Sequence, residues 1–227
     1  MAIVSIKNAS RHYQDGEHLV KALRGLDLTL EQGEFTAIMG PSGSGKTTLL
    51  NLIGGLDTPT EGTVTVSGAE VSAMSKAQRS DLRRDHVGFI FQSYNLIPVL
   101  TARENTEFVL LLQGKGAEER RARATEILAA VGLQGMEDRR PSELSGGQQQ
   151  RVAVARAIAT KPSIVLADEP TANLDSETKQ DLIALMRRMN EEEGVTFLFS
   201  THDPEVIKVA RRVVRMRDGD VESDERR

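Results

Sequence analysis

The apolar residues of the chain follow two different periods, and this division predicts a mixed α/β fold. Runs that alternate in polarity or are rich in β-branched residues, as strands are, cover 3–9, 26–40, 62–68 and 87–92. Two almost wholly apolar runs, 163–168 and 195–200, indicate strands buried on both faces of a parallel sheet. The run 211–221 predicts a hairpin with its turn at RDGD, and we expect residues 222–227 to form a solvated tail.

Helical periodicity is clearest at 117–131, where Glu119 and Arg123 are spaced as an i,i+4 ion pair. It recurs at 175–190, a run that begins with an Asp–Ser pair suited to capping a helix. Because the region 95–158 carries almost no strand signal, we expect it to form a helical subdomain. The α/β core around it is then expected from 1–94 and 159–227, so that the whole chain is a single domain.

A phosphate-binding loop is predicted at residues 40–47, GPSGSGKT. This segment follows an apolar strand and precedes a helix-forming run, which is the setting that such a loop needs. Backbone amides of the glycines can wrap a phosphate, and the following helix adds its positive end. We expect Lys46 to bridge the β- and γ-phosphates and the Thr47 hydroxyl to bind Mg²⁺. The predicted nucleotide-binding residues here are Gly40, Pro41, Ser42, Gly43, Ser44, Gly45, Lys46, Thr47 and Thr48.

Polar residues with catalytic potential follow three other predicted strands. Asp168 and Glu169 come at the end of a buried strand, where open α/β sheets bind their ligands. We expect Asp168 to hold Mg²⁺ through water, and Glu169 to be the general base for the water that attacks the γ-phosphate. Gln92 ends another strand and can meet Mg²⁺ or the attacking water. His202 follows a third strand and can hydrogen-bond the γ-phosphate.

The segment LSGGQQQ, residues 144–150, shows a second helix start with the marks of an anion site. Ser145 is an ordinary N-cap, but each of the two glycines after it weakens the first helical turn by roughly 1 kcal/mol. Bare amides at a helix N-terminus suit a phosphate group. The chain therefore has two phosphate-binding helix starts, but only one lysine-bearing loop and one acidic pair.

Composition narrows the choice of partners. The 227 residues are 39% hydrophobic and 27% charged, which is ordinary for a globular protein, and the net charge of −4 gives no reason to expect nucleic acid as a ligand. The absence of cysteine excludes disulfides, thiolate catalysis and zinc–thiolate sites. The N-terminal sequence does not resemble a signal peptide, and apolar runs are far shorter than the ~20 residues that span a bilayer. We therefore expect any membrane role to come through a partner.

Together these motifs resemble, in content and in order, the ATP-binding subunits of ABC transporters. They are GPSGSGKT, Gln92, LSGGQ, LADEP, NLD at 173–175, and His202. The resemblance covers essentially the whole chain. NLIGGLDTPTEGTV, FIFQSYNLIP and LADEPTANLDS are most similar to the LolD/MacB-type subfamily, which powers lipoprotein release, macrolide or peptide export and related envelope tasks. The resemblance implies an α/β P-loop NTPase fold with a RecA-like core, an N-terminal antiparallel β region and an inserted helical subdomain. It also implies that ATP and Mg²⁺ are the ligands.

The resemblance also implies a use for the second helix start. In this family the signature LSGGQ of one subunit covers the γ-phosphate held by the phosphate loop of the other, in a head-to-tail homodimer with two ATP molecules. Asp175 is then expected at the same interface, and Tyr13 occupies the position of an aromatic residue that stacks on adenine. The residues assigned to the ATP of the partner copy are Ser145, Gly146, Gly147 and Gln148.

The resemblance implies an integral membrane permease as the partner. Through that permease, the chain is expected to lie peripherally at the cytoplasmic face of the inner membrane. We expect the apolar segment 94–100, held extended by Pro98, to receive a cytoplasmic helix of that permease. A signalling clamp resembling FtsE is the alternative, because it uses the same motifs. DNA-repair ATPases with long coiled coils and translation factors with two cassettes are disfavoured by the absence of heptads and of a second phosphate loop. The motifs do not identify the cargo.

Overall fold

A mainly parallel six-stranded sheet, in the order β10-β9-β3-β8-β7-β6, forms the centre of the protein. The computed structural model describes residues 2–16 and 18–227. The strands are β3 (Phe35–Met39), β6 (Val87–Ile90), β7 (Ile164–Asp168), β8 (Phe197–Ser200), β9 (Arg212–Arg217) and β10 (Asp220–Arg226). As the apolar runs predict, β8 is buried throughout and β7 is buried up to its last residue. Strand β3 pairs in parallel with β8 on one side and β9 on the other, so it lies in the middle of the sheet.

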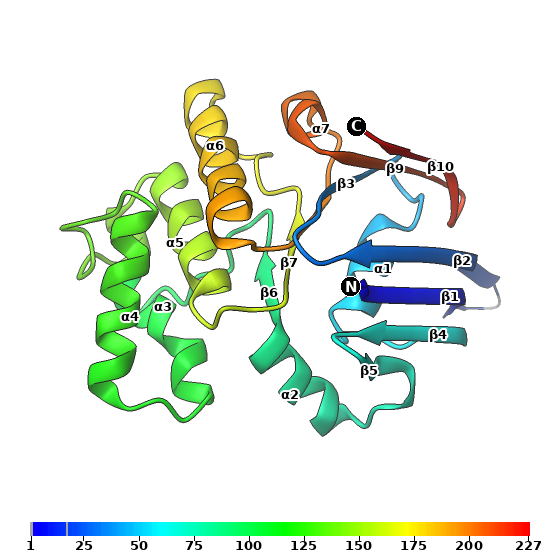
Figure 1. Ribbon diagram of the computed structural model, residues 1–227, viewed down its shortest axis with the longest axis horizontal. Coiled ribbons are helices and arrows are strands. Elements are labelled where there is room, and N and C mark those ends of the chain that lie inside the picture. Colours follow the sequence, from blue (N-terminus) through cyan, green and yellow to red (C-terminus); the bar gives the residue numbers. More distant parts are fainter. Residues whose placement is uncertain (1, 17) are drawn as a thin grey trace.

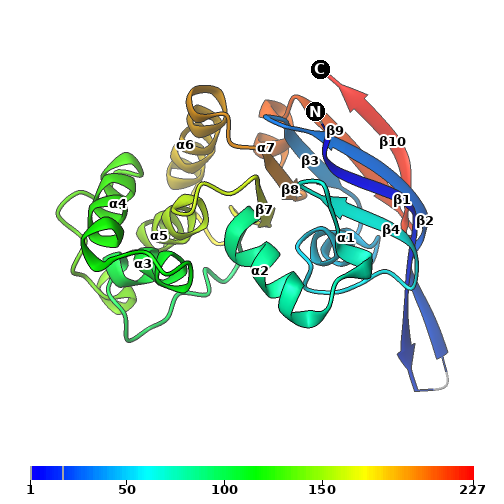
Figure 2. The same cartoon turned by 60° about the horizontal axis from the view of Figure 1, so that its bottom comes forward.

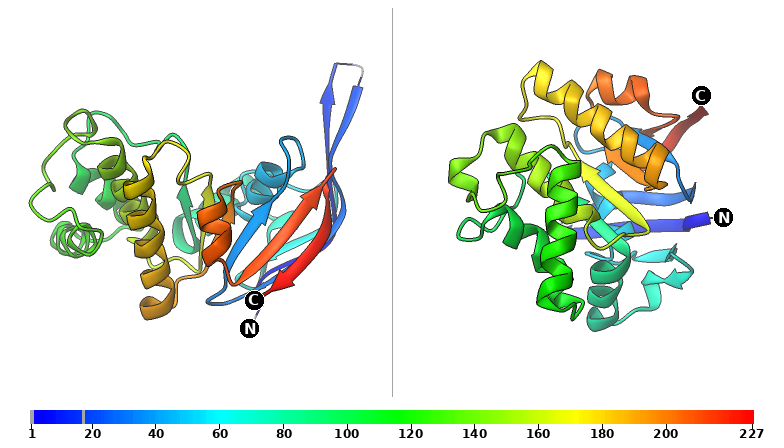
Figure 3. Two further views of the ribbon diagram at one scale, coloured as in Figure 1. Left: turned by 90° about the horizontal axis from the view of Figure 1, so that it is seen from above. Right: turned by 60° about the vertical axis from the view of Figure 1, so that its left-hand side comes forward.

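An antiparallel sheet, ordered β2-β1-β4-β5, covers one side of this centre (Figures 1 and 2). Its strands are β1 (Ala2–Asp15), β2 (His18–Glu31), β4 (Glu61–Val66) and β5 (Ala69–Glu70). Pairing between β1 and β4 stops at Ser10 and Glu61, but β1 and β2 remain paired as far as Asp15 and His18. The two strands therefore project from the body as a two-stranded ribbon, which is visible in Figure 3.

Helix α1 (Lys46–Ile53) lies between the two sheets, and its Leu49, Leu50, Leu52 and Ile53 are buried in the core that they share. The other helices are α2 (Lys76–His86), α3 (Ala102–Leu112), α4 (Ala117–Ala130), α5 (Gly146–Ile158), α6 (Ser176–Glu193) and α7 (Pro204–Val209), with short 3₁₀ turns at Val71–Ala73 and Pro141–Glu143. Helices α3, α4 and α5 lie together at the β6 side of the sheet (Figure 1). No helix within the described ranges is long and apolar enough to cross a bilayer.

Helix α5 packs very closely on β6. A Cβ atom at Gly88 of β6 would overlap the carbonyl oxygen of Ala157 in α5. A side chain at position 88 would therefore have to push helix and strand apart. The glycine sets the distance between the helical group and the sheet.

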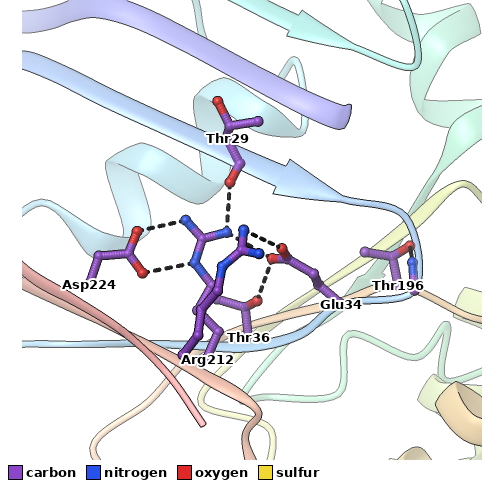
Figure 4. Close-up of polar contacts among 8 residues, drawn as sticks. Thr29, Glu34, Thr36, Thr196, Arg212 and Asp224 are labelled. Carbon is purple, nitrogen blue, oxygen red and sulfur yellow. Dashed lines mark hydrogen bonds and ion pairs between the residues drawn. The ribbon is translucent and has the colours of Figure 1, made fainter. Parts of the chain in front are cut away.

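Arg212 joins the two sheets through a buried polar network (Figure 4). Its side chain donates two hydrogen bonds to the Asp224 carboxylate, at 2.8 and 2.7 Å. Its Nη1 atom donates to Glu34 Oε2 at 2.8 Å and to the carbonyl oxygen of Thr29, in β2, at 2.7 Å. The residue is only 6% exposed, so these bonds compensate for the desolvation of its charge.

Several local expectations are wrong. Residues 222–227 are not a free tail, because β10 continues to Arg226 and carries Asp224 into the Arg212 network. Arg123 pairs with Glu126 rather than Glu119, since an i,i+3 partner lies within 3.0 Å of its Nη1 atom. Glu119 instead meets Lys115, at 2.8 Å.

The segment after β6 also differs from its expected form. Strand β6 ends at Ile90, so Gln92 lies in a turn beyond the strand rather than at its last position. Pro98 does not hold the chain extended, because the amide of Leu100 donates to the carbonyl of Ile97 at 3.1 Å and closes a turn around it. The side chain of Leu96 packs against the main core.

Candidate active site

An open cavity of about 800 Å³ brings the predicted nucleotide-binding and catalytic residues together. It lies where β3 and β7 end, the edge at which open α/β sheets bind ligands. Ser44 is the one predicted loop residue absent from its lining, because its side chain is buried. The lining comprises Tyr13, Val20, Lys21, Ala22, Gly40, Pro41, Ser42, Gly43, Gly45, Lys46, Thr47, Thr48, Gln92, Asp168, Glu169, Ser200 and His202.

The phosphate loop has a backbone that only glycine fits at two points. Gly45 has a φ of 98°, and a Cβ atom there would lie 2.5 Å from the carbonyl oxygen of Ala22. At Gly40 an added Cβ would overlap the backbone of Met216 in β9. Gly45 is also the N-cap of α1 and makes no side-chain cap, so the first amides of the helix face the cavity without a capping side chain. Such a helix start favours a phosphate group.

Lys46 is held at the mouth of this loop. Its ammonium group donates to the carbonyl oxygens of Gly40, at 2.7 Å, and Pro41, at 3.0 Å. Both acceptors are neutral, so the ammonium charge remains available to a phosphate in the cavity.

Oxygen donors for a divalent cation lie directly beside the loop. Thr47 Oγ1 is 3.3 Å from Asp168 Oδ2, and Gln92 lines the same cavity. Hydroxyl, carboxylate and amide oxygens are hard ligands, which Mg²⁺ prefers. The site offers only a few of these oxygens, and Mg²⁺ is typically held by one or two protein groups together with substrate phosphates. The residues therefore fit Mg²⁺.

Glu169 is oriented by two side chains from the loop after β8. Its Oε1 atom lies 2.7 Å from His202 Nδ1, and its Oε2 atom accepts a hydrogen bond from Thr201 at 3.2 Å. The backbone is held as well, because the Glu169 amide donates to Ser200 at 2.8 Å. Glu169 has a φ of 46°, an uncommon left-handed conformation for a non-glycine residue. Such strained residues concentrate at functional sites.

Tyr13 also lines the cavity. Its hydroxyl donates to Asp57 Oδ2 at 2.8 Å, and the Arg11 guanidinium carbon lies 4.7 Å from the centre of its ring. Arg11 also pairs with Asp57 at 2.8 Å, so the three side chains fix one another. The ring is thereby prepared to contact a flat ligand such as a base.

The signature residues lie apart from this cavity. Ser145 caps α5 by accepting a hydrogen bond from the Gln148 amide at 3.3 Å, as the sequence predicts, and the Gln148 side chain accepts from the Ser145 amide. None of Ser145, Gly146, Gly147 and Gln148 belongs to the cavity lining. The helix start therefore lies outside the ligand site of its own chain.

Asp175 caps the neighbouring helix α6. Its carboxylate accepts hydrogen bonds from the Thr178 amide, at 3.0 Å, and the Thr178 hydroxyl, at 2.7 Å. These bonds, the backbone one foremost, lower the pKa of Asp175 below its ordinary value. A Cβ atom at Gly147 would overlap Thr178, so the signature and the Asp175 loop are packed together.

Sequence reasoning missed three supporting residues. Asn173 donates to the carbonyl oxygen of Gln92 at 2.9 Å, Thr201 bonds Glu169, and Asp57 fixes Tyr13. Asn173 belongs to the NLD motif and Thr201 directly precedes His202, and each position is a usable signal. Asp57 lies far from Tyr13 in sequence and has no such signal.

Comparison with known proteins agrees with this geometry. The family model described as ABC transporter matches residues 23–172. An uncharacterized ABC transporter ATP-binding protein of Methanocaldococcus jannaschii, MJ0796, is 46% identical over 99% of this chain and 97% of its own length. The macrolide export ATP-binding/permease protein MacB of Marinobacter nauticus is 46% identical over 98% of this chain. That match covers 34% of MacB, so the chain spans about a third of that relative.

A solved structure has the same fold. The dimeric post-hydrolysis state of MJ0796 bound to ADP and Pi superposes with a TM-score of 0.91 at 45% identity, and the match covers 98% of both chains. The expected α/β P-loop fold of this family is therefore confirmed, and so is the resemblance read from the motifs. The chain belongs to the ABC transporter family and is one of its ATP-hydrolysing cassettes.

Proposed function

We propose that two copies of this chain bind two ATP molecules head to tail and hydrolyse them to drive a separate membrane permease. The single observation that carries the proposal is the placement of the signature. Ser145 and Gly146 begin a helix suited to phosphate, yet they lie outside the cavity that contains Lys46 and Glu169. A second copy turned head to tail gives that helix start a phosphate to cover. The dimeric MJ0796 structure supports this arrangement.

Within each site, the chain's residues have separate tasks. Lys46 and the loop amides bind the β- and γ-phosphates, and the Tyr13 ring supports adenine. Glu169 accepts a proton from the attacking water, and His202 holds the carboxylate in position from 2.7 Å away while its other ring nitrogen can reach the γ-phosphate. Bound Mg²⁺, held by Thr47 and through water by Asp168, would neutralise the charge that develops on the phosphates.

Closure of the dimer would move two parts of each chain. We propose 1–94 and 159–227 as the part that holds nucleotide, and 95–158 as the part that presents the signature. Gln92 lies just before the boundary between them. Contact of Gln92 with the γ-phosphate would couple the binding of ATP to the position of the helical part.

The partner proposed for this motion is a permease, because the MacB relatives are ATP-binding/permease proteins. A groove of about 340 Å³ between α2, β6 and α3 offers a docking surface. It combines apolar side chains with arginines, among them Leu56, Phe89, Val109, Leu112, Arg83 and Arg156. We propose that a cytoplasmic helix of the permease enters here. The cassette would then work at the cytoplasmic face of the inner membrane, in macrolide-type export or lipoprotein extraction. The export names of the relatives favour transport over an FtsE-like clamp.

Mixed dimers test the head-to-tail arrangement directly. Ser145→Arg subunits and Lys46→Ala subunits should each be nearly inactive alone, because both sites of either homodimer lack a part. In a confirmed heterodimer, one site has an intact phosphate loop facing an intact signature, so about half of wild-type ATPase activity per dimer should return if the sites act independently. Heterodimers with no activity would refute action of the signature in the partner's site.

A further inference from the structure

Ser200, the last residue of β8, carries a buried hydroxyl that has no hydrogen-bond partner among residues 2–16 and 18–227. The residue is only 1% exposed, so bulk water does not satisfy this group either. A buried hydroxyl without a partner costs about as much free energy as a lost hydrogen bond, and most buried polar groups in native proteins are paired. The Ser200 hydroxyl therefore needs an acceptor that these contacts do not supply.

The position of Ser200 distinguishes it from other serines of this kind. In the described ranges, Ser44, Ser67 and Ser223 also have a buried hydroxyl without a partner. None of these three lines the nucleotide cavity, whereas Ser200 does. The acceptor for Ser200 is therefore to be sought at the nucleotide site.

Strand register places Ser200 beside Asp168. The two residues are direct partners in the parallel pairing of β7 with β8. Leu166 and Leu198, the partners two positions earlier, are buried in the core that contains the apolar residues of α1. Because side chains alternate between the two faces of a strand, Asp168 and Ser200 project from this same face. The contact between Asp168 and Thr47 of α1 agrees with this direction.

The Asp168 carboxylate in turn lacks a firm orienting partner. Over the described ranges it accepts one hydrogen bond, from Thr47 to Oδ2 at 3.3 Å, which is long for a hydroxyl donor. Glu169, by contrast, is contacted by both Thr201 and His202. Carboxylates at a metal site are normally hydrogen-bonded to further protein groups, which fix their orientation. The Oδ1 atom of Asp168 is available for such a bond.

We infer that Ser200 is a positioning residue for Mg²⁺, whose hydroxyl donates to the Asp168 carboxylate when that carboxylate holds Mg²⁺ through water. A serine side chain has one torsion, so a single rotation moves its hydroxyl between staggered positions. This inference rests on the proposed role of Asp168 in holding Mg²⁺. Ser200 then orients the carboxylate without touching either the metal or the nucleotide.

Binding of Mn²⁺, measured by its EPR signal, tests this role apart from turnover. The protein is the full chain carrying Glu169→Gln and loaded with ATP, so that nucleotide is not consumed. Adding Ser200→Ala should raise the Kd for Mn²⁺ about 10-fold, the lower end of the effect of losing a hydrogen-bond partner of a metal ligand. Binding of ATP without a divalent metal should not change. In a chain that retains Glu169, Ser200→Ala should lower ATPase activity at limiting Mg²⁺, and saturating Mg²⁺ should restore most of it.

A pair of variants with the same shape separates the hydroxyl from the volume of the side chain. Ser200→Thr keeps the hydroxyl and should bind Mn²⁺ as tightly as the serine does, whereas Ser200→Val should bind it as weakly as Ser200→Ala. Ser223→Ala is the matched control, because it removes another unpartnered buried hydroxyl outside the cavity and should leave Mn²⁺ binding unchanged. In urea unfolding without nucleotide, Ser200→Ala should be at least as stable as wild type, since it leaves no group unpaired.

Any of four results would overturn the inference. They are unchanged Mn²⁺ affinity in both Ser200→Ala and Ser200→Val, equal losses in Ser200→Thr and Ser200→Val, an equal loss in Ser223→Ala, or reduced stability of Ser200→Ala without nucleotide. Asp168→Asn separates this failure from that of the proposed function. If Asp168→Asn weakens Mn²⁺ binding and the Ser200 variants do not, only the role of Ser200 is wrong. If Asp168→Asn binds Mn²⁺ normally, the proposed role of Asp168 is itself wrong.

Discussion

His202 Nδ1 lies 2.7 Å from Glu169 Oε1, so the imidazole and the carboxylate are within hydrogen-bonding distance. The glutamate side chain is 17% exposed, whereas the histidine is 79% exposed. The carboxylate is thus fixed from within the core, while the imidazole that contacts it faces the open side of the site. A partner subunit closing over the cavity would bury His202 and exclude water from the hydrogen bond, which strengthens it.

Glu169→Gln should separate ATP binding from hydrolysis. The amide keeps the shape of the side chain but cannot accept a proton from water, so kcat should fall by about 10²- to 10⁴-fold. Nucleotide affinity should remain, because Lys46 and the loop amides are unchanged. In size-exclusion chromatography with Mg-ATP the variant should elute as a dimer and without nucleotide as a monomer. Elution as a monomer in both conditions would contradict the proposal that ATP joins two subunits.

The docking groove predicts a variant that affects only the assembled transporter. Leu112 lines the groove and is 55% exposed, so Leu112→Glu should weaken copurification of the permease without disturbing the core. Basal ATPase activity of the cassette alone should be unchanged, because Leu112 does not line the nucleotide cavity. Leu111→Glu is a matched control, since Leu111 is 50% exposed on the same helix but is outside the groove. Equal loss of permease from both variants would place the docking surface elsewhere on α3. Leu96→Glu is a poorer test, because Leu96 packs against the core and its replacement should also unfold the protein.

Arg212→Met should destabilise the fold in a pH-dependent way. Hydrogen bonds from Arg212 hold the pKa of Asp224 below its ordinary value of 3.8, so this pair stabilises the native state above that pH and loses its effect as the pH falls below it. At pH 7 the variant should lose about 3 kcal/mol of the free energy of unfolding, since a buried charged network is broken. The difference from wild type should shrink below about pH 4 in urea unfolding series.

Arg215→Met gives the comparison on the same strand. Its pair with Glu225 is long, at 3.9 Å, and largely exposed, so its loss should cost less than about 1 kcal/mol. A cost for Arg212→Met as small as this, or one independent of pH down to 3, would contradict a stabilising role for the buried network.

Sequence patterns predict the buried strands of this protein well. The runs that become β7 and β8 are almost wholly apolar because parallel strands are covered on both faces. The phosphate loop and Ser145 cap are predictable for a similar reason, since each is a local backbone requirement expressed in a few adjacent residues. The resemblance to a family adds the roles of residues such as His202 that have no local signature.

Long-range polar contacts are where sequence reasoning fails. The end of the chain looks like a solvated tail because Asp224 and its neighbours are charged. The end of the chain is instead strand β10, in which Asp224 accepts a hydrogen bond from Arg212, a buried residue of the adjacent strand. Arg156 of α5 donates a hydrogen bond to the carbonyl oxygen of Tyr94. The sequence does not predict this contact either, because the two residues are distant in sequence. A pattern along the chain reports which residues are buried, but not which buried charges meet.

The position of β3 in the sheet has a consequence for biosynthesis. This strand ends at the phosphate loop and is made early, yet its two neighbours, β8 and β9, are made only after helices α1 to α6. Until both emerge from the ribosome, β3 has no partner strand, and Gly40 lacks the β9 backbone against which it packs. Pairings this distant in sequence form slowly, and until they form the apolar segments remain exposed and can bind chaperones. The phosphate loop of the nascent cassette therefore lacks its supporting strands until β8 and β9 have been made.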